Sequence, residues 1–158
     1  MLFRSRIEQV ATPHEIFAKP ANLFVASFIG TPQMNLLPAV CRAIEDGQVR
    51  FRVDAQEVVL PMEPPTLARL GRGAKVTLGV RPRAFELTHE PAEGTLSAVA
   101  DLIEPMGAET LVHMLEGERD IRVVVERTRR VRPGERLHMR PKPGQVHVFD
   151  ETGGRISA

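Results

Sequence analysis

The stretch LLPAVCRAIEDGQVRFRV, residues 36–53, decides the fold of this chain. At its centre stands Asp46-Gly47, a dipeptide that readily adopts the positive φ angles of a tight hairpin turn. After the turn, Val49, Phe51 and Val53 alternate with arginine. Successive side chains of a strand point to opposite faces, so this alternation puts the apolar residues on one buried face. The stretch therefore predicts an antiparallel hairpin.

Short strands separated by turns continue to the end of the chain. Besides 36–44 and 49–53, strands are expected at residues 57–60, 76–80, 95–103, 109–115, 120–125, 136–140 and 145–149. The pair 109–115 and 120–125 forms a second hairpin around Glu116-Gly117-Glu118, and Pro105-Met106-Gly107 is expected to break the strand before it. Residues 61–73 contain three prolines and two glycines, which predicts a connection with one helical turn. Many short strands at regular spacing favour an OB-like barrel.

Two short helices are predicted before the first strand. Thr12-Pro13-His14-Glu15 combines a capping threonine, a proline suited to the first helical position and a glutamate that can complete a capping box. This helix ends before Pro20, and a second helix from Ala21 to Ile29 stops at Gly30. The predicted fold class is therefore mainly β, with one or more OB-like barrels of short antiparallel strands behind a short two-helix N-terminal lead.

The composition is that of a globular protein with a modest core. The chain has 158 residues, of which 42% are apolar, and a formal net charge of +1, so whole-chain electrostatics indicate no nucleic-acid partner. The single Cys41 excludes an intrachain disulfide, and its place inside a strand predicts a buried, inert thiol. No apolar run is long enough to span a membrane and no signal peptide is visible, so we expect a cytoplasmic protein.

Residues 6–39, RIEQVATPHEIFAKPANLFVASFIGTPQMNLLPA, carry a family motif. They resemble the segment that joins two domains in the ABC-type ATPases of bacterial maltose and glycerol-3-phosphate importers. In that family the pattern G-x-P-x-E-I-(F/Y)-x-x-P-A-x-x-F-V-A-x-F-I-G-(S/T)-P-x-M-N closes the nucleotide-binding domain. Here Ala11 replaces the leading glycine, and the other positions match. Weaker likeness follows at Leu78–Pro82, where Arg83 stands in place of the usual glutamate, at Glu104–Thr110 and at Val148–Gly153.

The resemblance implies a domain division. Residues 1–35 would be the last helices of an ATPase domain with its linker, and residues 36–158 an OB-like regulatory domain. Met1–Ser5 depart from the family's usual Asp-Gly, so we expect a fragment or an orphaned C-terminal domain of a transport ATPase. ATP and magnesium would belong to the parent subunit, with no cofactor, metal or catalytic residue in this chain. The parent would be cytoplasmic and peripheral to the inner membrane.

The resemblance also implies partners and contact residues. The expected partners are the chain's own ATPase domain, a second copy in a homodimer, the permease subunits indirectly, and a regulatory protein. The candidate dimer or regulatory contacts follow strands and are Arg81, Pro82, Glu104, Gly107 and Glu109. The candidate linker and interdomain packing residues are Phe24, Phe28, Gly30, Pro32, Met34 and Asn35. The apolar face of the second helix could pack on either the β domain or an ATPase domain.

A search for catalytic or metal-binding motifs gives no strong candidate. Gly71–Thr77 is the nearest string to a phosphate-binding loop, but its spacing is wrong and it leads into a strand. His138 and His147 would face each other if Lys142-Pro143 were the centre of a final hairpin. Two imidazoles without a third ligand make a poor zinc site, so a surface pair is favoured over a metal or pH-sensing role.

Two further functions are alternatives to the regulatory role. OB barrels often bind single-stranded nucleic acid, and a basic run is present at Arg127, Arg129, Arg130, Arg132 and Arg136. The chain lacks the Trp and Tyr that stacking platforms use, so the run is interpreted as a solvated loop or a protein contact. A free-standing OB-like domain could instead bind an oxyanion or a sugar, near Arg81 or the Gly107-Ala108-Glu109 turn.

Overall fold

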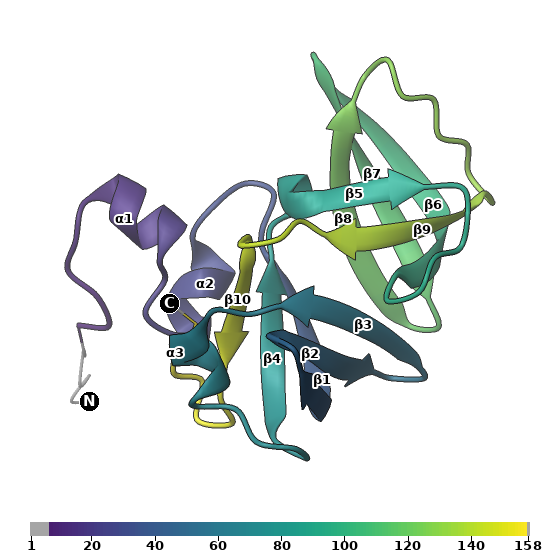
Figure 1. Ribbon diagram of the computed structural model, residues 1–158. Coiled ribbons are helices and arrows are strands. Elements are labelled where there is room, and N and C mark those ends of the chain that lie inside the picture. The colour runs from purple at the N-terminus through teal and green to yellow at the C-terminus, as the bar shows by residue number, and fades with distance from the viewer. Residues whose placement is uncertain (1–6, 158) are drawn as a thin grey trace.

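The computed structural model describes residues 7–157 as two five-stranded antiparallel sheets that follow a helical lead (Figure 1). The first sheet has the order β10-β4-β1-β2-β3 and the second the order β5-β9-β6-β7-β8. The strands are β1 Asn35–Glu45, β2 Gln48–Val53, β3 Gln56–Pro61, β4 Lys75–Val80, β5 Phe85–Thr88, β6 Leu96–Met106, β7 Glu109–Glu116, β8 Arg119–Glu126, β9 Arg136–Pro141 and β10 Val146–Phe149. The predicted mainly β fold class is confirmed. Met1–Arg6 and Ala158 lie outside the described residues, and so does the prediction for Met1–Ser5.

The first hairpin forms as its sequence predicts. Asp46 and Gly47 have φ angles of 50° and 76°, which is the backbone that a tight turn between β1 and β2 requires. On β2 the side chains of Val49, Phe51 and Val53 are buried, and the arginines between them are not. Local turn chemistry and the alternation of side chains therefore agree with the packing.

Short helices have the predicted caps. In α1, Pro13–Ala18, the Thr12 hydroxyl accepts from the Glu15 backbone N–H while the Glu15 carboxylate accepts from the Thr12 backbone N–H. The Thr12 hydroxyl also donates to the Glu15 carboxylate at 2.6 Å, and this bond, followed by the one from the Thr12 backbone N–H, lowers the pKa of Glu15. Helix α2, Leu23–Phe28, begins later than predicted because the Asn22 side chain is its cap. One helical turn, α3 Pro64–Leu67, lies in the predicted connection, and a 3-10 turn, η1 Pro82–Ala84, follows β4.

One strand was missed, and one prediction about a strand is wrong. The short strand β5 was not expected, because Phe85–Thr88 has no turn signal before it other than Pro82. Strand β6 does not break at Pro105 but continues to Met106. Pro105 is opposite Thr110 on β7, and β9 pairs only with the beginning of β6, so the missing N–H faces no partner strand. Gly107, with a φ of 77°, makes the turn.

The expected pairing of His138 with His147 is also wrong. His138 on β9 is opposite Thr88 and Ser97, whereas His147 on β10 is opposite Gly79. A tight turn does form, since the Gln145 N–H donates to the Lys142 carbonyl, but it connects the two sheets. The Lys142 N–H donates to the Ala84 carbonyl at 2.8 Å, beside the second sheet. The chain then crosses to the first sheet, where β10 pairs with β4. Two strands beside one turn need not pair with each other.

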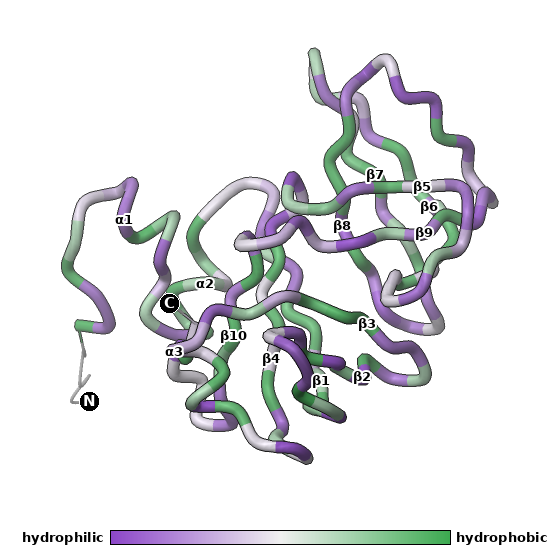
Figure 2. Tube along the Cα trace, viewed as in Figure 1, coloured by the Kyte–Doolittle hydropathy of each residue, from purple (hydrophilic) through white to green (hydrophobic). Residues whose placement is uncertain are grey.

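Both sheets contribute to one apolar core, and a smaller cluster holds the helical lead. In Figure 2 apolar segments lie along strands of both sheets, and hydrophilic residues predominate in the loops. The main core includes Cys41, and burial raises the pKa of its thiol, as expected for an inert cysteine. The smaller cluster consists of Ala26 of α2, Met34 and Phe149 of β10. It attaches α2 to the first sheet.

Candidate functional site

The candidate site consists of the residues that join the helical lead, the first sheet and the second sheet to one another. Asn35 stands at the start of β1 with only 3% of its surface exposed. Its Nδ2 donates to the carbonyls of Val80, at 3.1 Å, and Arg122, at 2.8 Å, and its Oδ1 accepts from the Arg122 N–H at 2.8 Å. One carboxamide therefore satisfies its own hydrogen-bonding groups while connecting the first sheet to β8 of the second.

A second carboxamide makes an equivalent connection. Gln56 on β3 donates through Nε2 to the Ser97 carbonyl at 2.9 Å, and its Oε1 accepts from the Ser97 N–H at 2.6 Å. Each amide thus pairs with the backbone of the opposite sheet as a strand residue would. Asn35 was among the predicted linker residues, but Gln56 was not found, since a glutamine at a strand start gives no local signal.

Arg81 fixes the helical lead to the end of β4. Its guanidinium lies 3.6 Å from the centre of the Phe17 ring, Nη1 donates to the Ile29 carbonyl at 2.9 Å, and Nη2 donates to the Phe17 carbonyl. Burial lowers the pKa of Arg81, although a guanidinium stays charged. Gly30 has a φ of 111°, and a Cβ there would lie 2.8 Å from Arg81 Nη1. Both helices of the lead are thereby bound to one side chain.

We expect Arg81→Met to loosen the helical lead without unfolding the sheets. The variant loses the cation–π contact and two charged hydrogen bonds, which together contribute about 2–4 kcal/mol. A helix as short as α1 does not persist without tertiary contacts. Hydrogen exchange of residues 13–29 should accelerate at least about tenfold for each 1.4 kcal/mol lost. Arg83→Met, which removes only an exposed ion pair, should leave that exchange unchanged.

Burial, with the help of two nearby arginines, keeps His147 neutral. Its pKa is lowered to about 4, first by burial and then by the nearby charges of Arg155 and Arg81. The imidazole ring centre lies 6.3 Å from that of Phe149. At neutral pH the ring is therefore uncharged, and it lies beside the Phe149 ring on β10. Within the described residues no group of His, Cys, Asp or Glu could hold a metal ion.

The remaining predicted contact residues lie around η1 and the hairpin of β6 and β7. Pro82 is buried in η1. Glu109 accepts from Arg83 Nε at 2.8 Å, and this pairing lowers the pKa of the carboxyl and raises that of the guanidinium. Glu104 lies 3.8 Å from His113 Nε2, and Gly107 forms the hairpin tip. The structure thus brings Pro82 and Glu109 to one region, while Arg81 points to the helical lead.

Two large apolar side chains of the lead face outward. Phe24 is 60% exposed and Phe28 is 68% exposed, and their ring centres are 4.8 Å apart. Val25 and Ala26, on the opposite side of α2, are buried. The expected apolar face is thus divided: one side packs on the first sheet, and the phenylalanines form an exposed pair. Thr31-Pro32 has a cis peptide bond, and Met34 is buried.

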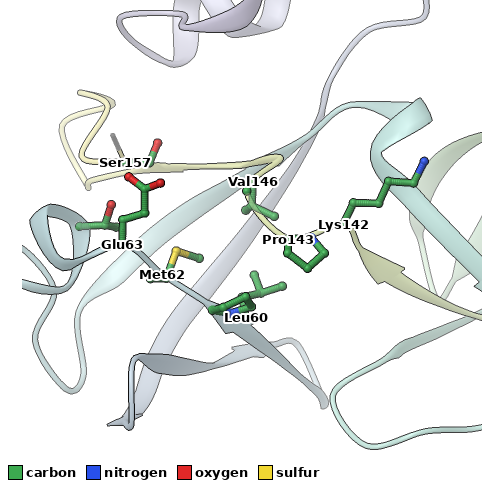
Figure 3. A pocket seen from close by; sticks show the side chains of 10 residues that line it. Leu60, Met62, Glu63, Lys142, Pro143, Val146 and Ser157 are labelled. Carbon is green, nitrogen blue, oxygen red and sulfur yellow. The ribbon is translucent and has the colours of Figure 1, made fainter.

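A small cavity lies between β3, α3 and the turn before β10 (Figure 3). Its volume is about 60 Å³, and its lining is Leu60, Pro61, Met62, Glu63, Thr66, Lys142, Pro143, Gly144, Val146 and Ser157. Figure 3 shows Glu63 near Ser157 at one side, whereas the Lys142 ammonium group points away from them. The Ser157 hydroxyl accepts from the Val148 N–H. The cavity has room for a few waters, far less than a typical ligand pocket of about 300–1,000 Å³.

The fold and its joints define a β module of the OB class that follows a short helical lead. The MalK OB fold domain matches residues 30–85, and the TOBE domain matches residues 78–149. The chain therefore belongs to the MalK OB fold and TOBE domains of ABC importer ATP-binding subunits, as the motif of residues 6–39 predicted. None of the helices within residues 7–157 is long and apolar enough to cross a membrane.

Relatives with this arrangement are longer than the chain. It is 39% identical over 154 residues to an uncharacterized ABC transporter ATP-binding protein of Sinorhizobium fredii, covering 96% of this chain and 39% of that protein. It is 41% identical over 150 residues to the sn-glycerol-3-phosphate import ATP-binding protein UgpC of Shigella sonnei, covering 94% of this chain and 40% of the relative. UgpC of Escherichia coli is 40% identical over 150 residues, covering 94% of this chain and 40% of that protein. The chain thus spans about 40% of the length of these relatives.

A solved structure shows the same fold. The cytoplasmic molybdate-binding protein ModG, with molybdate bound, superposes with a TM-score of 0.60 over 72% of this chain and 94% of that chain. The two sequences are 18% identical. At that identity the likeness extends to the fold alone, and molybdate binding is a property of ModG.

Proposed function

We propose that this chain is the regulatory, dimer-stabilising domain of the ATP-binding subunit of a bacterial importer for sugars or glycerol phosphate. The observation that carries the proposal is the divided face of α2. One side is fixed to the first sheet through Ala26, Met34 and Phe149, and the other side presents Phe24 and Phe28 to the exterior. Such a pair of exposed rings beside a rigid joint suits attachment to a nucleotide-binding domain.

The joint also explains how movement could be transmitted. The lead is bound by Arg81, and the first sheet is bound to the second by Asn35 and Gln56. A rotation of the attached domain would therefore carry both sheets as one body. The rest of the parent subunit binds ATP and magnesium, hydrolyses the ATP and contacts the permease. This domain keeps two subunits together. A regulatory protein would bind the same β module.

The contact between two copies is assigned to the hairpin of β6 and β7. Arg81 and Pro82 are engaged within the chain, so the accessible predicted residues are Glu104, Gly107 and Glu109. A two-fold contact uses one patch twice, which suits a projecting hairpin. Charge reversal at Glu109 in a full-length subunit should weaken its dimer, as sedimentation would show.

We expect the exposed phenylalanines to bind a nucleotide-binding domain. The partner for the measurement is the separately produced ATPase portion of the Escherichia coli relative, which is 40% identical in the shared region. Phe24→Ser with Phe28→Ser should reduce its affinity for this chain at least about tenfold, because burying each ring contributes about 1.5–3 kcal/mol. Thermal unfolding of the chain alone should change little, since both rings are exposed.

Leu102→Ser is the matched change, because Leu102 is also exposed, at 49%, but lies on β6. It should leave the affinity unaltered. Equal binding by the double variant and by the unchanged chain would contradict the proposal.

A further inference from the structure

A cleft of about 290 Å³ is lined by residues of both sheets. Strand β2 of the first sheet contributes Gln48 and Arg50. Strand β3 contributes Pro61 and Val59, which lie opposite them. All four residues share the outer face of the first sheet, because the residues between them on each strand are buried. The volume is at the lower end of the range of small-ligand pockets.

The other wall of the cleft belongs to the second sheet. Arg140 and Pro141 end β9, and Pro143 lies in the turn that follows. The loop between β5 and β6 supplies Glu93 and lies close against β3. A Cβ on Gly94, which has a φ of 72°, would be 3.0 Å from the backbone nitrogen of Val59, so this close approach requires glycine. Residues from both sheets are therefore needed to form the cleft.

Glu93 contacts both guanidinium groups of the cleft. Its carboxylate accepts from Arg50 Nη2 at 3.1 Å, and its carbonyl accepts from Arg140 Nη2 at 3.4 Å. Arg50 also pairs with Glu57 at 3.2 Å, so two carboxylates offset its charge. Arg140, by contrast, forms no ion pair with any carboxylate among residues 7–157. The cleft therefore contains one guanidinium whose charge is unpaired.

The lining combines three kinds of chemical group. A guanidinium recognises a carboxylate or a phosphate through two parallel hydrogen bonds. The Gln48 amide can donate and accept, and the Glu93 carboxylate can accept, so both suit hydroxyl groups. The rings of Pro61, Pro141 and Pro143 present C–H surface to the cleft. A ligand that matches all three groups has one acidic group and several hydroxyl groups on a short carbon chain or ring.

We propose that this cleft binds a small polyhydroxylated anion, a sugar acid or a sugar phosphate. The Glu93 carboxylate is directed to Arg50, so the acidic group of the ligand lies on the Arg140 side. Its hydroxyl groups bond to Gln48 and Glu93. Because Arg50 and Arg140 belong to different sheets, the bound ligand ties the two sheets together. No residue of α2 or of the turn between β6 and β7 lines the cleft, so the site is independent of the proposed attachment and dimer contacts.

The first test is a calorimetric titration of the unchanged chain with gluconate and with glucose 6-phosphate. At least one of them should bind saturably at one site per chain. Glucose lacks the acidic group and inorganic phosphate lacks the sugar hydroxyls, so each should bind at least about tenfold more weakly. Binding of gluconate alone would assign a sugar acid, and binding of glucose 6-phosphate alone would assign a sugar phosphate. Either result supports the proposal.

A matched pair of variants and an amide measurement locate the site. Arg140→Gln should weaken binding at least about tenfold, because it removes the charged hydrogen-bonding partner of the acidic group. Arg130→Gln, which changes another exposed arginine in the loop after β8, should leave the affinity unaltered. Both side chains are exposed, so both variants should fold. In amide NMR spectra the ligand should shift the signals of Gln48, Val59 and Glu93.

Four outcomes would overturn the proposal. The first is absence of heat and of amide shifts with both anions up to about 10 mM. The second is an equal loss of affinity in Arg140→Gln and Arg130→Gln. The third is binding of glucose or inorganic phosphate as tight as that of the hydroxylated anions. The fourth is a set of amide shifts confined to residues 127–132, which would mark a general anion surface on the arginine-rich loop.

Discussion

Asn35→Leu should lower the free energy of unfolding by about 3–5 kcal/mol, because it leaves one buried and two partly buried backbone groups without their partner. The groups are the carbonyls of Val80 and Arg122 and the Arg122 N–H. Leucine has a similar size but can neither donate nor accept. Urea unfolding should show a lower midpoint, and hydrogen exchange along β8 should accelerate.

Gln56→Leu provides the comparison for this result. Gln56 makes the same kind of connection through two hydrogen bonds but is only partly buried, so water can replace the lost partner. Its cost should be about 1–2 kcal/mol. If Asn35→Leu were no more destabilising than Gln56→Leu, the joint between the sheets would not depend on the buried carboxamide.

Phe149→Ala should destabilise the chain by about 3–5 kcal/mol, the usual effect of removing a fully buried ring. The ring packs against Ala26 and Met34, and a Cβ on Gly79 would lie 2.8 Å from its Cε2. The cavity cannot collapse easily, because β10 and β4 are paired beneath it. The variant should lower the thermal midpoint and also accelerate hydrogen exchange in α2.

Phe28→Ala is the matched truncation, since Phe28 is 68% exposed on α2. It should change stability by no more than about 0.5 kcal/mol. Normal exchange in α2 after Phe149→Ala would show that the small cluster does not hold the helical lead.

Features that depend on neighbouring residues agree with their sequence patterns. The capping box of Thr12 and Glu15, the turn at Asp46-Gly47 and the alternation after it all form as expected. Each depends on contacts within a few residues, so a short stretch contains the information. The family motif of residues 6–39 likewise agrees with the matched domains, since the likeness is a matter of sequence.

Features that depend on distant residues could not be read in this way. The turn at residues 141–144 is visible in the sequence. Its flanking strands do not pair with each other, because β9 pairs with β6 and β10 pairs with β4. Arg81 resembles a surface contact until Phe17 and Ile29 are placed beside it, 64 and 52 positions away. Gln56 gives no signal until Ser97 lies opposite.

The sequence by itself determined that this protein is a β module of the importer ATPase family, with capped helices before a hairpin of alternating strands. Those properties follow from local backbone preferences and from a motif written in consecutive residues. Tertiary structure decided which strands share a sheet, which amides join the sheets, and which aromatic rings remain exposed. Hydrogen-bonding groups and apolar surfaces far apart in the chain compete for the same partners, and only the folded arrangement settles that competition.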